Sequence, residues 1–589
     1  MAYNSYKEDE KSVEKSKLQT LKRLLSYLLK YKWTIVLVLM LMGYCVVVSL
    51  INPLIIESAI DNHIGNKDYI GLYKLLIIAL IINLIATFAI KLRMYIMAKM
   101  CNQILLTIRQ ELYTHIQKLG FKFFDSRPTG KILSRIIGDI NSLKDVLSNC
   151  VTTLIPDFIT VCAVVIIMFS KNPKLAVAAL ISTPFMAIAI TMIQVKAHPR
   201  WQTFRKKSSN LNAFLHEDMS GMKIIHSFTA EKETEETFDE LLNEHKSSFR
   251  SAVRLSDCFG SVIDFSWGFG CVALYFIGIV VLKDENISVG TFLAFGTYIN
   301  MFWQPINNLS NFYNQITTNI AGAERIFEIL DTKPEIEDEK GVVDLPDIKG
   351  EVTFDHVTFG YDEEKVLDDV SFVIKPGETI AIVGPTGAGK STIINLISRF
   401  YDANEGRVLL DGYDVKDVSI ESLRKQVGTM TQENFIFSGT VKDNIRYGKL
   451  DATDEEIIEA AKAVNAHEFI MKLDKGYDTE LLERGGGLSI GQKQILALAR
   501  TMVSKPKILI LDEATSSIDT KTELIVQKGI DKLLSGRTSF VIAHRLSTIK
   551  KADRIFVVDN GKIIEEGNHR QLLKKKGAYY NLYMAQFNI

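Results

Sequence analysis

The sequence is poor in the features on which several common protein classes depend. Its six cysteines all lie in the first half of the chain and include no CxxC pair, so neither a disulfide framework nor a zinc knuckle is indicated, and we interpret them as apolar filling. No net charge remains once 69 basic and 69 acidic side chains cancel, which argues against a nucleic-acid binder. The composition, 47% hydrophobic, also excludes extended disorder and collagen-like repeats.

The 589 residues exceed what one hydrophobic core holds, so at least two domains are expected. Apolar runs of membrane-spanning length fill the chain to about residue 323, and the mean hydropathy is +0.11. Beyond about residue 350, short strands, glycine-rich turns and helices alternate as in a soluble α/β domain. The predicted parts are a cytoplasmic N-terminus (1–32), a helical transmembrane domain (33–330), an acidic linker with two prolines (331–350) and an α/β domain (351–589).

Six segments are long and apolar enough for helices that cross a bilayer core of about 30 Å, which takes about 20 residues. They are residues 33–57, 70–90, 150–170, 175–195, 261–282 and 289–312. The first is not a signal peptide, because no small-residue cleavage site accompanies it. The amphipathic basic stretch before it, residues 16–32, predicts a helix along the inner leaflet.

Basic residues indicate the orientation of these spans. Residues 91–146 and 196–254 carry ten Lys or Arg each, whereas the three short loops on the other side carry four between them. By the positive-inside rule, both long loops and both termini are cytoplasmic. The chain is therefore expected to be a multi-pass protein of the cell membrane.

One stretch is free of helix breakers over an unusual length. From Leu72 to Leu119 there is no Gly or Pro, so a single helix of 48 residues would reach about 72 Å, of which about 40 Å would project into the cytoplasm. A compact aromatic turn follows at 121–130, and a second turn is expected around Glu217–Glu231. Long helices that end in such turns are suited to carrying force. The alternative is a stiff hairpin with no moving part.

The second half contains the phosphate-loop pattern GxxxxGK[ST] at Gly384–Ser391, between the strand-like Thr379–Val383 and a helical run at 392–400. Backbone N–H groups of such a loop hold phosphates, and the helix N-terminus adds a positive end. Lys390 is expected to reach the β- and γ-phosphates, and Ser391 to bind Mg²⁺. We therefore expect a P-loop ATPase domain of α/β fold after the six transmembrane helices and their long cytoplasmic extensions.

The apolar run Ile508–Leu511 ends in two acids, Asp512 and Glu513. This pattern is typical of a buried parallel strand whose tip holds a carboxylate near a metal. Asp512 is expected to support Mg²⁺, and Glu513 to polarise the water that attacks the γ-phosphate. The alternative is a buried strand that ends in two solvated acids.

Several further motifs resemble those of ABC transporters. Leu488-Ser-Ile-Gly-Gln492 resembles the LSGGQ signature and stands 20 residues before Asp512. The match runs from about residue 16 to the C-terminus, and the layout is similar to that of bacterial multidrug-type ABC exporter half-transporters. The other matching motifs are the Q-loop Gln432, the switch His544, the D-loop Ser516–Asp519, the adenine-stacking Tyr361, the loop Glu483–Gly485 that touches coupling helices, and the first coupling loop Phe124–Gly130.

This resemblance implies two nucleotide domains that meet head to tail and enclose ATP and Mg²⁺. It therefore implies a second half-transporter as partner. The expected catalytic residues are Glu513, His544 and Lys390, and the expected Mg²⁺ ligands are Ser391, Gln432 and Asp512. The residues expected to bind ATP are Tyr361, Gly384, Pro385, Thr386, Gly387, Ala388, Gly389, Lys390, Ser391, Thr392 and Gln432, with Ser489, Gly491 and Gln492 facing the ATP of the other chain.

The sequence departs from the family pattern at two positions. Ile490 replaces the third residue of the signature, a glycine, and Leu482 stands where a glycine is usual. A β-branched side chain beside a phosphate site restricts the backbone and takes up space. We therefore favour a heterodimer. Its partner would lack a glutamate after the Walker B aspartate, which is the residue equivalent to Asp512 of this chain. A homodimer that tolerates Ile490 is the alternative.

Polar residues in the sixth segment bear on the transported substrate. Asn300, Gln304, Asn308, Asn311, Gln315 and Asn319 recur every three or four residues and share one helix face, which lines either a helix seam or a wet cavity. Asp157 lies about 20 Å from the outer end of its span, where an unpaired carboxylate costs about 2.5–3.5 kcal/mol. It is expected either to attract cationic substrates or to make a structural pair.

The combined features favour ATP-driven export of hydrophobic or amphipathic small molecules. A soluble DNA-repair ATPase does not have six membrane spans, and an importer normally separates its membrane and nucleotide parts. A dedicated lipid or peptide exporter and an ATP-gated channel remain alternatives, although the sequence has no peptidase-like N-terminal extension that would support peptide export.

Overall fold

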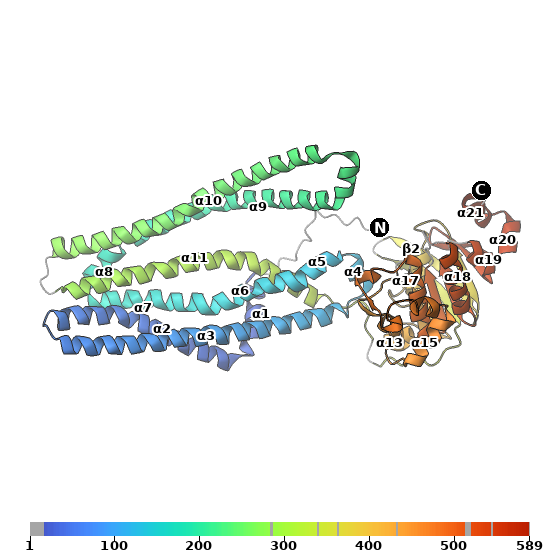
Figure 1. The fold of residues 1–589 in the computed structure, drawn as a ribbon, viewed down its shortest axis with the longest axis horizontal. Coiled ribbons are helices and arrows are strands. Elements are labelled where there is room, and N and C mark those ends of the chain that lie inside the picture. The colour runs from blue at the N-terminus through green and yellow to red at the C-terminus, as the bar shows by residue number, and fades with distance from the viewer. Residues whose placement is uncertain are drawn as a thin grey trace. The chain divides into compact units, whose positions relative to one another are not determined.

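The computed structural model describes residues 17–282, 287–338, 341–361, 364–431, 434–512, 520–542 and 546–587. The chain forms two compact units, one helical and one that contains both sheets and helices (Figure 1). The helical unit contains the described residues up to Ile116 and Gly130–Asp331. The mixed unit contains Gln117–Thr129 and the chain from Thr332 onward, so a short segment between two long helices belongs to it.

The helical unit is built from long helices joined by short connections (Figure 1). Its elements are α1 (Lys17–Leu29), α2 (Lys32–Ser58), η1 (Ala59–Ile64), α3 (Tyr69–Ile116), α5 (Thr129–Ser134), η2 (Arg135–Asp139), α6 (Ile140–Asn149), η3 (Cys150–Leu154), α7 (Ile155–Lys171), α8 (Pro173–Leu180), α9 (Thr183–Phe228), α10 (Glu231–Tyr275), η4 (Phe276–Leu282) and α11 (Val289–Asp331).

Within the described residues, five helical stretches are long and apolar enough to cross a membrane: Lys32–Ile64, Tyr69–Ile116, Thr129–Lys171, Pro173–Phe228 and Glu231–Val280. They contain four of the six predicted spans in full, and residues 261–280 of the fifth, which was predicted for residues 261–282. The sixth, residues 289–312, falls in α11, many of whose side chains lie outside the described residues, so the sixth span stays a prediction.

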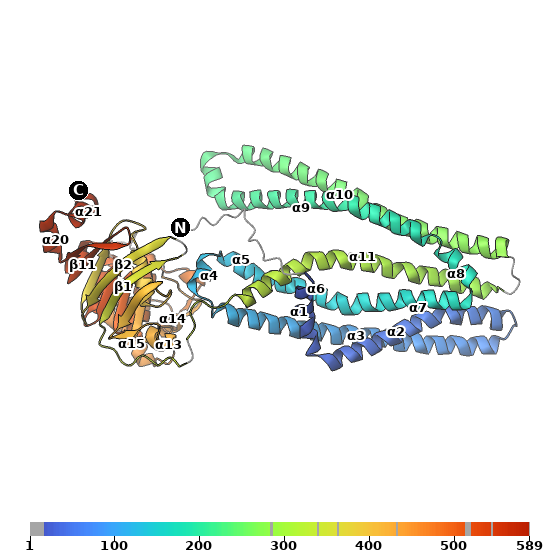
Figure 2. The ribbon, with the colours of Figure 1, turned by 180° about the vertical axis from the view of Figure 1, so that it is seen from behind.

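The long helix expected from the absence of Gly and Pro is α3, an unbroken helix of 48 residues (Figure 2). It begins and ends three residues earlier than predicted. The Asp68 side chain accepts a hydrogen bond from the backbone N–H of Gly71 at 3.0 Å and so satisfies a free donor of the first turn. The cap, and not the glycine, therefore sets where the helix begins.

The second turn is much shorter than predicted. Helix α9 continues through most of the expected turn to Phe228, and only Thr229 and Ala230 separate it from α10. Thr229 adopts the left-handed conformation, with φ of 53°, which ends the helix. The expectation of a turn across Glu217–Glu231 was therefore wrong in extent, because polar residues in that stretch are compatible with a solvated helix.

The mixed unit contains a six-stranded sheet of order β12-β11-β3-β10-β9-β6 and a four-stranded sheet of order β2-β1-β4-β5. Strands β11, β3, β10, β9 and β6 run parallel, and β12 joins β11 antiparallel. The strands are β1 (Val352–Gly360), β2 (Lys365–Ile374), β3 (Thr379–Val383), β4 (Glu405–Leu410), β5 (Tyr413–Asp414), β6 (Val427–Met430), β7 (Gly439–Thr440), β8 (Glu480–Leu481), β9 (Ile508–Asp512), β10 (Thr538–Ile542), β11 (Arg554–Asp559) and β12 (Lys562–Gly567).

Helices cover these sheets, and the buried side chains form two hydrophobic clusters. The strands β3, β9 and β10 are almost wholly buried, as parallel strands covered on both faces require. The helical elements are α4 (Phe121–Asp125), α12 (Lys390–Ile397), α13 (Ile420–Gln426), α14 (Val441–Arg446), α15 (Asp454–Ala463), α16 (His467–Ile470), η5 (Gly476–Asp478), η6 (Glu483–Gly485), α17 (Ile490–Val503), α18 (Thr520–Leu534), α19 (Leu546–Lys551), α20 (His569–Lys575) and α21 (Ala578–Phe587).

The acidic segment expected to be a linker is partly folded onto the mixed unit. Leu345 and Ile348 are buried, and the backbone N–H of Ile348 donates to Gln426 Oε1 at 2.9 Å. The Asp411 carboxylate accepts from the backbone N–H groups of Gly350 at 3.0 Å and Glu351 at 2.6 Å. The described part of this segment is therefore attached to the sheet domain before residue 351.

Candidate nucleotide-binding site

The predicted site residues follow strands that end at the same edge of the six-stranded sheet. Strands β3, β10, β9 and β6 are neighbours, and they run parallel. The phosphate loop follows β3, and Asp512 is the last residue of β9. His544, Glu513 and Gln432 lie outside the described residues, but each is within two residues of the end of β10, β9 or β6. Ligands of open parallel sheets bind at this carboxyl edge.

Glycines shape the phosphate loop because larger residues would not fit. Gly384, Gly387 and Gly389 have φ of 152°, 84° and 103°, in the region that favours glycine. A Cβ atom on Gly384 would lie 2.0 Å from the carbonyl oxygen of Val558, and one on Gly389 would lie 2.8 Å from Leu367 Cδ2. The backbone is thus held tightly against β11 and β2 at the start of α12.

The Lys390 amine lies over this loop. Its Nζ donates to the carbonyl oxygens of Gly384 at 2.9 Å and Pro385 at 2.7 Å. Burial lowers the pKa of Lys390, and the negative charge of Asp512 acts in the opposite direction. Lys390 and Asp512 thus interact across the sheet edge, as expected if both face one phosphate–metal site. In the first turn of α12, Ser391 is exposed and Thr392 is buried.

Tyr361, expected to stack on adenine, lies beside the phosphate-loop helix. Its hydroxyl is 3.2 Å from Thr392 Oγ1 and accepts from Asn395 Nδ2 at 3.4 Å. Its ring packs edge-on against Phe359 and Tyr401, each with ring centroids 5.0 Å apart. These contacts fix the ring next to α12. The sequence alone did not indicate Tyr401, because it lies 40 positions after Tyr361 and no motif marks it.

The signature residues begin helix α17. Ser489 Oγ accepts from the backbone N–H of Gln492 at 3.2 Å, and Gln492 Oε1 accepts from the backbone N–H of Ser489 at 2.9 Å, a reciprocal capping box. Gly491 is buried, whereas the Ile490 side chain is 58% exposed and that of Leu482 is 72% exposed. Both departures from the family pattern therefore point to solvent within the described chain and are compatible with its fold.

Two of the residues that were predicted to bear on the transported substrate contact each other in the helical unit. Asn308 Nδ2 of α11 donates to Asp157 Oδ2 of α7 at 3.0 Å. Of the polar stripe, Asn300 is exposed and Asn308 and Asn319 are half-buried, while the side chains of Gln304, Asn311 and Gln315 lie outside the described residues. The contact with Asn308 is thus a structural pair of the kind expected for Asp157. Because the Asn308 amide carries no charge, it does not neutralise the Asp157 carboxylate.

The residues present fit a nucleotide and its metal. The loop provides backbone donors at a helix start, Lys390 provides a cation, and Ser391 and Asp512 provide the hydroxyl and carboxylate oxygens that Mg²⁺ prefers. A fused chain with a helical membrane part and a phosphate-loop ATPase part, including a signature helix, defines an ABC transporter subunit.

Comparison with known families agrees with this class. Residues 33–306 match the family described as the ABC transporter transmembrane region, and residues 367–516 match the family described as ABC transporter. The chain is 42% identical over 572 residues to an uncharacterized ABC transporter ATP-binding protein of Bacillus subtilis, YknV, covering 96% of this chain and 94% of that protein. The chain therefore belongs to the ABC transporter family, and its ATPase domain is coupled to transport.

Other relatives carry more specific names. A putative multidrug export ATP-binding/permease protein of Staphylococcus aureus is 37% identical, covering 96% of this chain and 100% of that protein. An ATP-dependent lipid A-core flippase of Syntrophus aciditrophicus is 39% identical, covering 82% and 81%. The solved structure of a bacterial Atm1-family ABC exporter with ATP bound superimposes with a TM-score of 0.79 at 28% identity, covering 95% of this chain and 99% of that one.

Proposed function

We propose that the protein exports hydrophobic or amphipathic small molecules, drugs or lipids, across the cytoplasmic membrane by ATP-driven alternating access. The observation that carries this proposal is the convergence of the phosphate loop, Asp512 and the strand ends preceding Gln432, Glu513 and His544 at one sheet edge, in a chain that also carries a helical membrane unit. The multidrug and lipid relatives support the export direction and the substrate class.

Two chains are needed for one catalytic cycle. We place the γ-phosphate near Lys390, with Glu513 polarising the attacking water and His544 assisting it. Ser391, Gln432 and Asp512 would hold Mg²⁺, which neutralises phosphate charge when bound. Ser489 and Gly491 face the nucleotide of the other chain. Closure of the two ATPase domains moves the long helices and switches the cavity from inward- to outward-facing.

The membrane arrangement in this proposal has six spans, with both termini in the cytoplasm. The partner is a second half-transporter, and the exposed Ile490 favours a heterodimer because the side chain would approach the nucleotide held by that partner. The site that contains Ile490 would then be slow or inactive. The Glu513 of this chain would serve the competent site.

The test is ATP hydrolysis by this chain alone, purified and reconstituted in lipid with Mg²⁺, beside the Glu513→Gln variant. A partner requirement predicts little activity from a folded chain that still binds ATP. Robust hydrolysis that is lost in Glu513→Gln would show that the homodimer works and would contradict the heterodimer. Hydrolysis unaffected by Glu513→Gln would contradict the catalytic assignment itself.

A lipid substrate is the second candidate function, favoured by the likeness to the lipid A-core flippase. Proteoliposomes with a fluorescent phospholipid in one leaflet measure it directly. ATP-dependent movement of the lipid between leaflets would support lipid export. Movement of a water-soluble dye but not of the lipid would support drug export. An electrical current that follows ATP addition would instead indicate the channel alternative.

Asp157 allows a test of substrate charge. Because its partner Asn308 is neutral, the carboxylate remains able to attract a cation in the inner part of the membrane. We expect Asp157→Asn to lower transport of ethidium, a permanent cation, about fivefold, and transport of the neutral calcein acetoxymethyl ester less than twofold. Equal losses for both dyes would identify the Asp157–Asn308 contact as purely structural.

A further inference from the structure

Arg399, Phe400 and Tyr401, just beyond the end of the phosphate-loop helix α12, receive contacts from two segments that lead to the membrane part of the chain. Phe400 packs against Phe121 of α4 with ring centroids 4.5 Å apart, and the Tyr401 hydroxyl donates to the Asp125 carboxylate of the same helix. Burial and the Asp125 carboxylate raise the pKa of Tyr401, which keeps the hydroxyl protonated as a donor. Arg399, by contrast, contacts the acidic linker.

Arg399 is an unusual residue at the end of α12. Its side chain is only 3% exposed, and its backbone adopts the left-handed region with φ of 49°. The guanidinium donates to the carbonyl oxygen of Val418 at 2.9 Å and to Asp402 Oδ1 at 3.3 Å, and Nη1 lies 3.8 Å from Asp338 Oδ1. A buried guanidinium is costly when a carboxylate partner is removed, so the linker carboxylate is part of what holds this turn.

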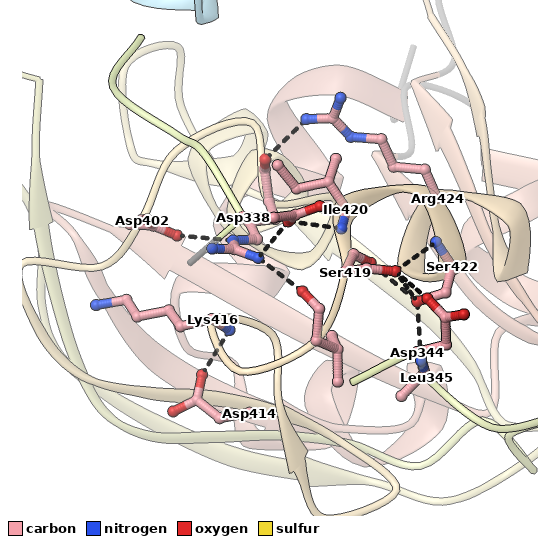
Figure 3. Close-up of polar contacts among 12 residues, drawn as sticks. Asp338, Asp344, Leu345, Asp402, Asp414, Lys416, Ser419, Ile420, Ser422 and Arg424 are labelled. Carbon is pink, nitrogen blue, oxygen red and sulfur yellow. Dashed lines mark hydrogen bonds and ion pairs between the residues drawn. The ribbon is translucent and has the colours of Figure 1, made fainter. Parts of the chain in front are cut away.

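Asp338 has a second contact that leads to another part of the nucleotide site. Its Oδ1 accepts from the backbone N–H of Ile420 at 3.0 Å, at the first turn of α13 (Figure 3). Helix α13 runs directly into β6, which ends at Met430, two residues before Gln432. One linker carboxylate thus touches both the end of the phosphate-loop helix and the start of the element that leads to Gln432.

Helices α12 and α13 are themselves joined at this point. Arg424 of α13 donates from Nη2 to the carbonyl oxygen of Arg399 at 3.0 Å and from Nε to that of Ser398 at 3.4 Å. Its guanidinium also lies over the Phe400 ring, 5.1 Å from the centroid. Because Arg424 satisfies carbonyl groups at the C-terminal end of α12, a displacement of either helix is passed to the other.

The other end of the linker, at Asp331, is also anchored by side-chain contacts. Asp331, the last residue of α11, accepts from Arg23 Nη1 of α1 at 2.7 and 2.9 Å, and the Arg23 guanidinium lies 4.3 Å from the Phe327 ring centroid. Six residues lie between Asp331 and Asp338, so the segment between the two anchors has seven Cα–Cα steps and spans at most about 25 Å when extended. A displacement of α11 that would require the segment to span more than about 25 Å must therefore move Asp338 or break its contacts.

We propose that Asp338 is a positioning residue for transport, which ties the end of α11 through Arg399 and Ile420 to both sides of the nucleotide site, as a route of coupling separate from α4. The two routes meet around a cavity of about 680 Å³ lined by α4, the linker and α13. The inference rests on the proposed ATP-driven transport. It predicts that loss of the Asp338 charge uncouples hydrolysis from transport and does not stop hydrolysis.

The test compares Asp338→Asn with Asp344→Asn in the full chain, together with its partner subunit if hydrolysis requires one. Asp344 lies in the same linker and accepts from Ser419 Oγ at the start of α13, so it tests docking of the linker without the contact to Arg399. Proteoliposomes report ATP hydrolysis and uptake of the dye Hoechst 33342 in parallel. Thermal unfolding of each variant is measured as well.

We expect Asp338→Asn to lower dye uptake per ATP at least fivefold while hydrolysis stays within twofold of the unmodified chain. Asp344→Asn should change that ratio less than twofold. The same ratio in both variants, or parallel losses of hydrolysis and uptake, would show that the linker is only a tether and would overturn the inference. Absence of dye uptake by the unmodified chain would count against the proposed function instead.

A second measurement decides the inference even without a transported probe. In the Glu513→Gln background, hydrogen–deuterium exchange at residues 332–338 is compared with and without Mg²⁺-ATP. Coupling through Asp338 predicts at least twofold slower exchange with ATP, retained in Asp344→Asn and lost in Asp338→Asn. An ATP effect of equal size in Asp338→Asn would refute the inference.

Discussion

Two helix starts in the ATPase domain differ in how their first backbone N–H groups are satisfied. Helix α12 follows Gly389, which has no side chain to cap it, so the first N–H groups remain available to an anion. Helix α17 follows Ser489, whose hydroxyl accepts from Gln492, while the Gln492 side chain accepts in return. The start of α12 is therefore suited to binding a phosphate, whereas the start of α17 already has a side-chain cap.

In the proposed dimer, this difference would allow one chain to supply half of each nucleotide site. The phosphate loop is confined by Val558 and Leu367, so its shape is fixed within the chain. The signature helix is fixed by its cap and presents an exposed Ile490 outward. Substitutions at α12 should therefore act on phosphate binding and chemistry, whereas substitutions at α17 should act on the approach of a second chain.

The largest effect is expected from Lys390→Ala. Removal of the cation that lies over the loop carbonyls should lower ATP hydrolysis at least about 100-fold, equivalent to about 2.7 kcal/mol of transition-state stabilisation. Steady-state hydrolysis by the reconstituted transporter measures it. Lys425→Ala is the control, because Lys425 forms a surface pair with Glu421. Unchanged hydrolysis in Lys390→Ala would contradict the phosphate-loop assignment.

Ile490→Gly tests whether the volume of the Ile490 side chain limits ATP hydrolysis. If Ile490 obstructs the nucleotide of the other chain, its removal should raise hydrolysis by the homodimer about three- to tenfold. The stability cost should be below about 1 kcal/mol, because the side chain is exposed. Leu482→Gly, another exposed departure from the family pattern, is the matched control. A similar rise in both variants would mean that the effect is not specific to the signature.

Ser489→Ala distinguishes the role of Ser489 as the cap of α17 from its proposed role at the nucleotide of the other chain. Loss of the hydroxyl that accepts from Gln492 should cost about 1 kcal/mol of domain stability. Thr453→Ala removes an equivalent capping box from α15, away from the site. We expect both variants to unfold at similarly lowered temperatures in calorimetry, but only Ser489→Ala to lower hydrolysis, by about tenfold. Equal hydrolysis in the two variants would restrict Ser489 to a structural role.

The smallest effect is expected from Tyr361→Phe. This change removes the hydroxyl near Thr392 but keeps the ring, so the Kd for ATP should change less than about twofold. Tyr361→Ala should raise it about tenfold or more, because stacking of a base on an aromatic ring contributes about 1–3 kcal/mol. Titration with a fluorescent ATP analogue distinguishes the two. A larger loss in Tyr361→Phe would show that the hydroxyl contact, and not stacking, fixes the nucleotide.

The parts of the structure that the sequence predicted are those with a local signal. The strand Thr379–Val383 occurs with the expected bounds, and the strand Ile508–Asp512 begins where expected, because each is a short apolar run that ends at a motif. A 48-residue helix was predicted from the absence of Gly and Pro between Leu72 and Leu119, and α3 has that length. Its bounds were missed by three residues because a single side chain, Asp68, decides where it begins.

The parts that the sequence did not reveal depend on contacts between distant residues. Asp338 and Ile420 are 82 positions apart, and Tyr401 and Asp125 are 276 apart. Acidic residues between prolines have the same local pattern whether they are solvated or bound to a buried arginine. The expected linker therefore could not be distinguished from a docked segment until the surface that receives it was known.

The unbroken length of α3 has a mechanical consequence. A helix without Gly or Pro after its first turn has no preferred point at which to bend, so a rotation at one end is delivered almost undiminished at the other. For an arm of about 40 Å, a tilt of about 5° moves the far end by about 3.5 Å, a little more than the length of one hydrogen bond. A lever of this kind turns a slight change in membrane packing into a displacement large enough to exchange one set of polar contacts for another.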